Sequence, residues 1–325
     1  MPDAATHGSS GSTEPAIDDA VIAFQTVRSG VAGRIVRLGS TVDEILTRHD
    51  YPEPVSRVLG EALVLAALLG SQIKFDGRLI LQTKTDGPVG FVVVHYDTAG
   101  SMRGYASFDA ERLSTMTAGG VRPDEGSLLG AGHLAMTIDP GGDMERYQGI
   151  VGMNHGTLSD AALEYFRASE QLPTFIHLAV ARHFASGVWS WRSGGLMVQH
   201  LTAEGGEQIP ERDDGAQTGW LLGAGDDNWR RIEMLARTVE DHELLDPTLA
   251  PERLLYRLFH EEGVRASPPS ALRMACRCSR ETVGAFLHRF GRAELADMRD
   301  PSGGVTVTCE FCATPYLFTD DELPQ

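Results

Sequence analysis

The pattern of apolar and polar residues divides the chain into a part rich in predicted strands, followed by a part rich in predicted helices. Short apolar runs separated by turn residues predict strands. The run over 21–38, interrupted at Ser29-Gly30, predicts a strand pair, and the turns at 86–88 and 98–100 predict a meander. The further predicted strands cover 78–85, 90–96, 102–108, 133–138, 146–153, 174–181 and 196–201.

Three helices are predicted among these strands. Thr41 begins one, with acidic residues in its first turn. The stretch 55–73 is apolar nearly all round, which indicates a helix buried on most sides. A third helix is predicted over 159–169, with Ser159 as its N-cap. Because strands outnumber helices and occur in runs, we expect an α+β domain with a mainly antiparallel sheet and packed helices.

A change of composition at 204–225, to Gly, Glu, Asp and Gln, predicts a domain boundary. Beyond it, short amphipathic helices carry an apolar stripe, which they cannot bury alone and must dock on another surface. The stripe consists of Trp229, Ile232, Leu235, Leu254, Leu258 and Phe259. We therefore expect a disordered tail (1–19), an α+β core domain (20–203), an acidic, Gly-rich loop (204–228), a helical linker (229–270) and a small C-terminal domain (271–325) that contains the cysteines.

Charge and hydropathy exclude several classes of function. The formal net charge of −17 disfavours nucleic acid as a partner, because phosphate backbones are also negative. The longest apolar run, 62–70, is shorter than the ~20 residues that cross a bilayer, so no membrane partner is expected. The polar segment 1–19 lacks the features of a secretory signal, which predicts a cytoplasmic protein. Neither a Walker pattern nor a dinucleotide fingerprint is present, and we expect no enzymatic activity.

The four cysteines lie close together in the sequence. All four lie in the C-terminal part, as a C-x-C (Cys276 and Cys278) and a C-x-x-C (Cys309 and Cys312). Two close pairs separated by an insert are typical of tetrahedral Zn²⁺ sites. Four thiolates leave no open position for water, so the metal would serve to fold the domain. Each pair can also be oxidised to a local disulfide, and the spacing leaves both a static zinc ribbon and a redox switch open.

Alternative functions use the same residues differently. Arg273, Arg277 and Arg280 surround the first cysteine pair and would offset the charge of the thiolates, or would simply be solvated. As a basic patch they would suit a static zinc-ribbon module that docks proteins or binds nucleic acid. A thiol-disulfide oxidoreductase using the C-x-x-C would need a thioredoxin-like βαβ setting, which the sequence does not show. His260 and His288 are not expected to ligate the metal, since four thiolates complete the site.

The residues around the cysteines resemble the switch domain of the bacterial 33-kDa heat-shock protein family, and the resemblance extends over roughly 21–323. The motifs that carry it, in the family's order, are His49-Asp50-Tyr51-Pro52, Lys74-Phe75-Asp76-Gly77, Asp86-Gly87-Pro88, Met102-Arg103-Gly104, Arg146-Tyr147-Gln148-Gly149-Ile150-Val151-Gly152, Glu164-Tyr165-Phe166, Ser169-Glu170-Gln171-Leu172-Pro173, Tyr256-Arg257-Leu258-Phe259-His260-Glu261-Glu262, Cys276-Arg277-Cys278-Ser279-Arg280-Glu281, Cys309-Glu310-Phe311-Cys312 and Tyr316-Leu317-Phe318.

This resemblance implies a redox-regulated, ATP-independent holdase, a chaperone of the stress response, that is inactive when reduced and bound to one Zn²⁺. The four cysteines would be the zinc ligands, and oxidation would form the disulfides Cys276–Cys278 and Cys309–Cys312, release the metal and unfold the linker. The exposed apolar surface would bind unfolded client proteins, with the linker stripe as a candidate client-binding surface. The oxidised form would be a homodimer and would pass clients to an Hsp70-type chaperone system. The chain departs from the family in its polar tail, in the loop 204–218, and at Ala313-Thr314, where a glycine is common.

Overall fold

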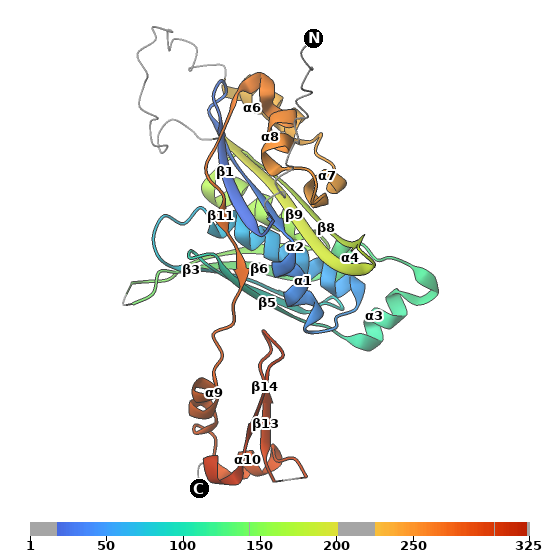
Figure 1. Cartoon of the computed structure of the whole chain (residues 1–325), viewed down its shortest axis with the longest axis vertical. Coiled ribbons are helices and arrows are strands. Elements are labelled where there is room, and N and C mark those ends of the chain that lie inside the picture. The colour runs from blue at the N-terminus through green and yellow to red at the C-terminus, as the bar shows by residue number, and fades with distance from the viewer. Residues whose placement is uncertain (1–17, 143, 201–224, 302, 324–325) are drawn as a thin grey trace, which may run out of the picture.

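The computed structural model describes residues 18–142, 144–200, 225–301 and 303–323 (Figure 1). Two sheets enclose a layer of helices, further helices cover the outer face of one sheet, and a small domain extends from the other. The α+β class and the mainly antiparallel sheets are as the sequence predicts. The predicted tail (apart from its last residues), the predicted boundary at 204–225 and the loop 204–218 fall almost wholly outside the described residues.

Sheet A has the strand order β10-β1-β2-β9-β8, with β11 also pairing with β1, and all its pairings are antiparallel. Its two longest strands, β8 and β9, form a hairpin that continues well beyond the predicted strands 174–181 and 196–201. The strands are β1 (Ala20–Thr26), β2 (Val31–Leu38), β8 (Thr174–Ala185), β9 (Val188–His200), β10 (Val264–Ala266) and β11 (Ser270–Ala271).

Sheet B has the order β12-β5-β4-β3-β6-β7. The predicted meander forms its centre, and its one described parallel pairing joins β12 to β5. The strands are β3 (Arg78–Thr85), β4 (Phe91–Asp97), β5 (Ser101–Ser107), β6 (Ala131–Asp139), β7 (Tyr147–Asn154) and β12 (Arg273–Met274).

The core between the sheets is built around α2 (Glu53–Gly70), which confirms the predicted buried helix. Its apolar residues point in every direction, because one side faces sheet A and the other faces sheet B. Around it lie α1 (Ser40–Thr47) and α5 (Leu158–Tyr165). Two short helices that the sequence analysis missed, α3 (Ala110–Met116) and α4 (Glu125–Leu129), follow the meander.

The predicted N-cap of the third helix was wrong. Thr157, not Ser159, caps α5, because its hydroxyl oxygen accepts the N–H of Asp160 while the Asp160 carboxylate accepts the N–H of Thr157. The helix then ends in a π-helical turn, Phe166–Glu170. Gln171 follows with a left-handed φ of 53°.

The linker helices dock on the outer face of sheet A, as the apolar stripe predicts. Ile232, Leu254, Leu258 and Phe259 are buried there, while Trp229 and Leu235 are half-buried at the margin. The ring of Phe259 stacks on that of Phe24, with 5.6 Å between the ring centroids. The helices are α6 (Gly225–Ala236), α7 (Asp241–Leu245) and α8 (Pro251–Phe259).

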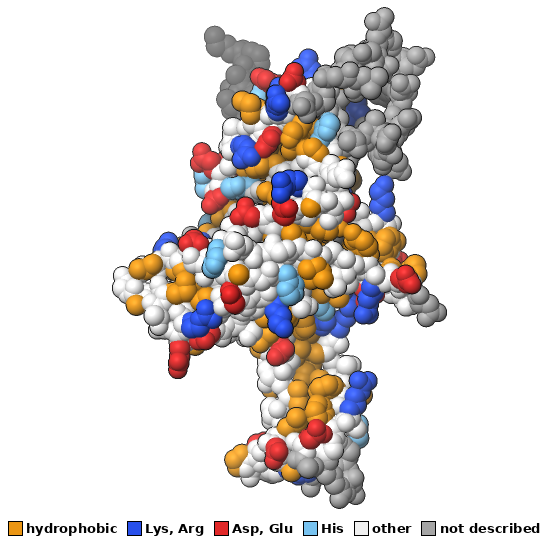
Figure 2. All heavy atoms as spheres, turned by 180° about the vertical axis from the view of Figure 1, so that it is seen from behind, with side chains coloured by type: hydrophobic (Ala, Val, Ile, Leu, Met, Phe, Trp, Pro, Cys, Tyr) orange, Lys and Arg blue, Asp and Glu red, His pale blue; other side chains and the backbone are white. Residues whose placement is uncertain are grey.

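The C-terminal domain has a very small core. It contains α9 (Arg280–Leu287), α10 (Arg292–Asp297) and a hairpin of β13 (Val305–Thr308) and β14 (Pro315–Phe318). Its buried apolar cluster is Leu287, Leu295, Val305, Phe318 and Leu323. Figure 2 shows apolar side chains on the surface of this narrow part, where Phe286 and Leu317 are about half exposed. A core this small stabilises a fold only with an additional cross-link such as a metal.

Among the described helices, none combines the length and hydropathy that a membrane span requires.

Candidate metal centre

The four cysteine sulfurs converge on one point between the two halves of the C-terminal domain. All four lie within 4.8 Å of one another, with 3.3 Å from Cys278 to Cys312 and 3.7 Å from Cys276 to Cys309. Sulfurs that each lie about 2.3 Å from a tetrahedral zinc ion are about 3.8 Å apart. The cluster therefore fits a four-thiolate metal site, and the cysteines are free thiols.

Two backbone elements, a strand edge and a hairpin turn, position these thiols. Cys276 follows β12, which is hydrogen-bonded along the edge of β5, and Cys278 precedes α9, whose N-cap is Ser279. Cys309 and Cys312 lie in the turn between β13 and β14, where the carbonyl of Cys309 accepts the N–H of Ala313 at 2.8 Å. The site thus depends on both a sheet edge and a hairpin turn.

Ala313 follows the last cysteine, at the pair Ala313-Thr314 where the resemblance leads to the expectation of a glycine. Its φ is 53°, in the left-handed region that a residue with a Cβ adopts only at a cost of about 1–2 kcal/mol. The turn keeps its backbone hydrogen bonds despite this conformation, because Cys309 also donates its N–H to the carbonyl of Thr314. Ala313 therefore lowers the stability of the turn, while the backbone hydrogen bonds of the turn are formed.

The thiols differ in acidity in the metal-free form. Burial raises the pKa of Cys278 to about 12 and also raises the pKa of Cys309, although the backbone N–H groups of Phe311 and Cys312 oppose the rise at Cys309. Burial also acts on Cys312, but hydrogen bonds with Thr314 and the neighbouring thiols lower the pKa of Cys312 to about 7. Cys312 therefore holds a thiolate more readily than Cys278 or Cys309.

The three arginines near the first pair do not form one basic patch. Arg277 pairs with Asp97 at 2.7 Å, Arg280 pairs with Glu322 at 2.7 Å, and Arg273 donates to the carbonyl of Ala99. Each thus has a partner away from the sulfurs. The hydrogen bonds of these arginines therefore do not support the expectation that they offset the charge of the thiolates.

The arginine that reaches a sulfur is Arg103, on β5 of the body. Its Nη1 lies 3.9 Å from the Sγ of Cys276. Arg103 belongs to the motif Met102-Arg103-Gly104, for which the sequence predicted no role. No sequence signal locates it, because its position follows from the pairing of β12 with β5, which places Met274 beside Met102 and so brings Cys276 near Arg103.

Arg103 also holds Phe311, one of the two residues between Cys309 and Cys312. Its guanidinium lies over the ring of Phe311, which in turn lies 5.0 Å, centroid to centroid, from the ring of His95. Arg103 donates to Nδ1 of His95 from two of its nitrogens. Burial, Arg103 and Arg78 lower the pKa of His95 to about 4, so this ring is neutral near pH 7 and accepts these bonds.

Further contacts join the cluster to the body. Arg48, at the end of α1, donates to the carbonyl of Cys312 at 3.3 Å. Asp97 on β4 accepts from Arg277 and from Arg78, which links the C-x-C to sheet B. The four-thiol cluster therefore lies directly against the outer face of sheet B as well as at the end of the linker.

Comparisons with known proteins agree with this architecture. The model of the family described as "Hsp33 protein" matches residues 19–319. A protein of Caulobacter vibrioides strain NA1000, named 33 kDa chaperonin, is 45% identical over 300 residues, which cover 92% of this chain and 94% of that protein. A protein of the same name from Ectopseudomonas mendocina is 35% identical over 296 residues, covering 91% of this chain and 90% of that protein.

A solved structure shares the fold. The crystal structure of a 33 kDa chaperonin, a heat shock protein 33 homologue from Thermotoga maritima, aligns with a TM-score of 0.70 and 24% identity, covering 94% of this chain and 96% of that one. The family match extends over both sheets, the linker helices and all four cysteines. The chain belongs to the Hsp33 family of chaperones.

Proposed function

We propose that the protein is a redox-regulated, ATP-independent holdase, switched by the four cysteines. One observation carries the proposal: the linker helices bury the apolar outer face of sheet A, and the chain that leaves them runs through β10, β11 and β12 into Cys276. A change at the cysteines is thereby connected along the backbone to the segment that covers the apolar outer face of sheet A.

In the reduced form, Cys276, Cys278, Cys309 and Cys312 hold one Zn²⁺, which supplies the folding free energy of the C-terminal domain. A structural zinc site contributes on the order of 10–16 kcal/mol in small metal-folded domains. The five buried apolar residues of this domain supply much less. The reduced domain is therefore folded, the linker is docked, and the holdase is inactive.

Oxidation by a peroxide or by hypochlorous acid removes the ligands. For each disulfide, two thiolates give up two electrons to one peroxide O–O bond, an S–S bond forms, and two protons from solvent complete two molecules of water. A disulfide no longer ligates zinc as the thiolates did. Once both pairs are oxidised, the domain loses its cross-link and unfolds.

We propose the pairs Cys276–Cys278 and Cys309–Cys312 as the disulfides, since each pair is close in sequence. In the reduced cluster the sulfurs of the other combinations are also close, at 3.7 Å for Cys276 with Cys309 and 3.3 Å for Cys278 with Cys312. Peptide mapping of the oxidised protein by mass spectrometry distinguishes the two patterns. Finding crossed disulfides would overturn the proposed pairing while leaving zinc release intact.

Unfolding of the C-terminal domain removes the contacts of Phe311 with sheet B and the anchor of β12 on β5. The short linker helices have little stability of their own. They leave sheet A, and the exposed apolar face binds unfolded client proteins. We further propose that the oxidised form is a homodimer, that it passes clients to an Hsp70-type chaperone system, and that it acts in the cytoplasm.

The direct test compares reduced and peroxide-treated protein for suppression of citrate synthase aggregation, measured by light scattering, while a chromogenic chelator reports free zinc. We expect suppression only after oxidation, together with release of one zinc ion per chain. Equal suppression in both states, or oxidation without zinc release, would contradict the proposal. The rival zinc-ribbon function predicts instead a salt-sensitive gel shift with nucleic acid.

A further inference from the structure

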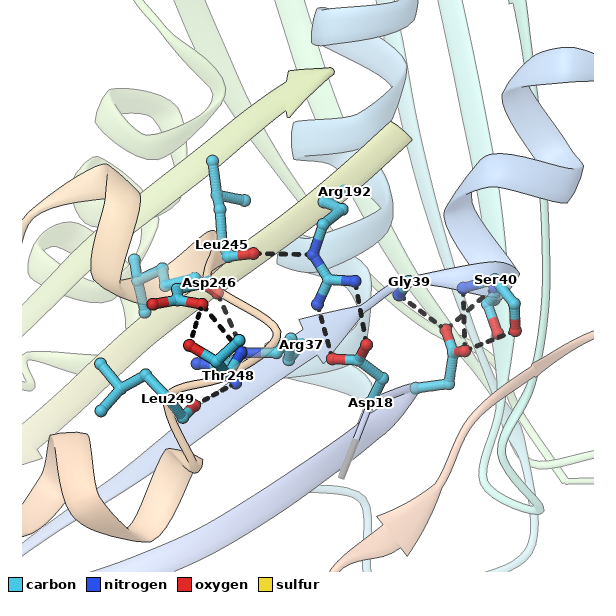
Figure 3. A network of polar contacts seen from close by, with 12 residues as sticks. Asp18, Arg37, Gly39, Ser40, Arg192, Leu245, Asp246, Thr248 and Leu249 are labelled. Carbon is cyan, nitrogen blue, oxygen red and sulfur yellow. Dashed lines mark hydrogen bonds and ion pairs between the residues drawn. The ribbon is translucent and has the colours of Figure 1, made fainter. Parts of the chain in front are cut away.

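Two buried arginines lie on the face of sheet A beneath the linker (Figure 3). Arg37 on β2 is 1% exposed and Arg192 on β9 is 7% exposed. Arginine is rarely buried so completely unless its donors are satisfied. What satisfies the donors of these two arginines therefore indicates what this surface binds.

The acceptors come mainly from the linker. Arg37 donates from Nε to the carbonyl of Leu244 at 3.0 Å, from Nη2 to that of Glu243 at 3.1 Å, and from Nη1 to that of Leu249. Arg192 donates from Nε to the carbonyl of Leu245 at 2.7 Å. Three of these carbonyls belong to the end of α7, where a helix has no backbone donors left for them. The arginine pair thus caps a helix C-terminus.

The charges around the pair favour an acidic partner. Both Nη atoms of Arg192 bind the carboxylate of Asp18 on the body, at 2.6 and 2.9 Å. The acceptors of Arg37 are linker carbonyls, and the carboxylates that act on it are Asp18 of the body and Asp246 and Glu252 of the linker. When the linker leaves, the described part of this site retains two arginines and one aspartate, so one positive charge is uncompensated.

The surroundings of the pair are apolar. Leu244 is fully buried against sheet A, and Leu245 is partly buried in the same cluster. The approach is close because β9 has glycine at 194: a Cβ there would lie 2.7 Å from the carbonyl oxygen of Leu244. The linker therefore presents two leucines, a row of carbonyls that accept from the arginines, and then Asp246 to this part of the sheet.

We propose that this spot is a client subsite, selective for apolar segments that end in acceptor oxygens, such as a helix C-terminus followed by Asp or Glu. Arg37 and Arg192 would bind those oxygens in the open form as they bind the end of α7 in the closed form. An arginine left buried without acceptors is costly, so a segment that supplies them is favoured over one that does not. The inference rests on the proposed function, because it concerns the surface that linker release exposes.

The test uses two fluorescent helical peptides with the same leucines, one ending in two aspartates and the other in two lysines. Their dissociation constants for the oxidised full-length protein are measured by fluorescence anisotropy. We expect the acidic peptide to bind at least about tenfold more tightly, the effect of one charge-assisted hydrogen bond. Arg37→Gln should abolish the preference, and Arg37→Lys should keep part of it. Arg182→Gln, at an exposed position of β8, should have no effect.

Equal binding of the two peptides, or an unchanged preference in Arg37→Gln, would overturn the inference. Failure of the proposed function would give a different result, because the oxidised protein would then not suppress the aggregation of citrate synthase. In that case the peptides are measured on the reduced Gly194→Val variant, in which the added side chain displaces Leu244 and exposes the same surface without oxidation. Circular dichroism of each variant checks that its body is folded. If Arg37→Gln is not folded, Arg192→Gln takes its place in the peptide measurements.

Discussion

The guanidinium carbon of Arg103 lies 4.1 Å from the centroid of the Phe311 ring, although the two residues belong to different domains. Phe311 stands between Cys309 and Cys312, so the contact joins the proposed metal ligands to the outer face of sheet B. The docked position of the C-terminal domain thus depends on the turn that the cysteines form. Loss of that turn releases the domain from the body as well as unfolding it.

Replacing Phe311 by alanine should loosen this docking while leaving the four thiols in place. A cation–π contact of a partly buried arginine contributes about 0.5–2 kcal/mol. We expect zinc content to stay at one ion per chain, but hydrogen exchange of β12 and the adjoining strand β5 to become faster in the reduced form. Leu317→Ala, at an exposed apolar position of the same domain, is the matched control. Unchanged exchange in Phe311→Ala would show that the contact does not hold the domain.

Replacing both Cys309 and Cys312 by serine should remove zinc and unfold the C-terminal domain even under reducing conditions. Its small apolar cluster cannot sustain the fold without the metal. Zinc content and NMR signal dispersion of the full-length protein measure the two effects. Thr308→Ser, in the adjoining strand, should change neither. A double variant with a folded C-terminal domain would refute the claim that the metal stabilises it.

Ala313→Gly should stabilise the reduced domain by about 1 kcal/mol, because glycine adopts the left-handed φ of this turn without strain. The measurement is the chelator concentration at which half of the zinc is lost, which should rise. Ala296→Gly, at an exposed position of α10, should act in the opposite direction, since glycine destabilises a helix by about 1 kcal/mol. A lower chelator midpoint for Ala313→Gly would contradict the assignment of strain to this residue.

Gly194→Ala should displace the linker in the reduced, zinc-bound protein. The new Cβ would lie 2.7 Å from the carbonyl oxygen of Leu244, closer than any stable contact of that kind. We expect faster proteolysis of α7 and α8 and measurable suppression of aggregation without oxidant. Gly152→Ala, on β7, adds the same methyl group where no atom lies within 4 Å and serves as the control. A resistant linker in Gly194→Ala would mean that the sheet accommodates the methyl group.

A half-buried acidic pair, Glu61 and Glu125, predicts a dependence of stability on pH. Burial and the neighbouring Glu125 raise the pKa of Glu61 in α2 well above its usual value. At pH values between the unfolded-state and the folded-state pKa of Glu61, the native state binds more protons than the unfolded state. The free energy of unfolding should therefore fall as pH rises through this window. Glu61→Gln should remove that fall and stabilise the protein at pH 7, as measured by urea unfolding from pH 5 to 8. Glu53→Gln, exposed on the same helix, should keep the pH dependence of the wild type.

The features that sequence analysis predicted correctly are those with a local or periodic signal. The buried helix α2, the meander and the linker stripe each have a repeating pattern of apolar residues, and the cysteines have a spacing that suits one metal. Strands β10, β11 and β12 were missed because two or three residues are too few to show a period. The hairpin of β8 and β9 was predicted too short, since exposed aromatic residues at its tip, such as Trp189, hide the alternation.

Residues whose roles depend on tertiary register could not be predicted. Arg37 and Arg192 lie in strands, where an arginine ordinarily points to solvent, and only the docked linker explains their burial. Arg103 meets Phe311 because β12 aligns beside β5, a pairing between segments more than 150 residues apart in sequence. No pattern within either segment specifies the other.

The segment 264–274 occupies an outer position on both sheets: β10 and β11 cover the free side of β1, and β12 covers that of β5. Its departure would leave two rows of backbone N–H and C=O groups without partners. Such strand edges are templates for any extended chain, whatever its side chains. Opening the protein would therefore offer clients a sequence-independent mode of attachment, main-chain pairing, in addition to the proposed apolar face.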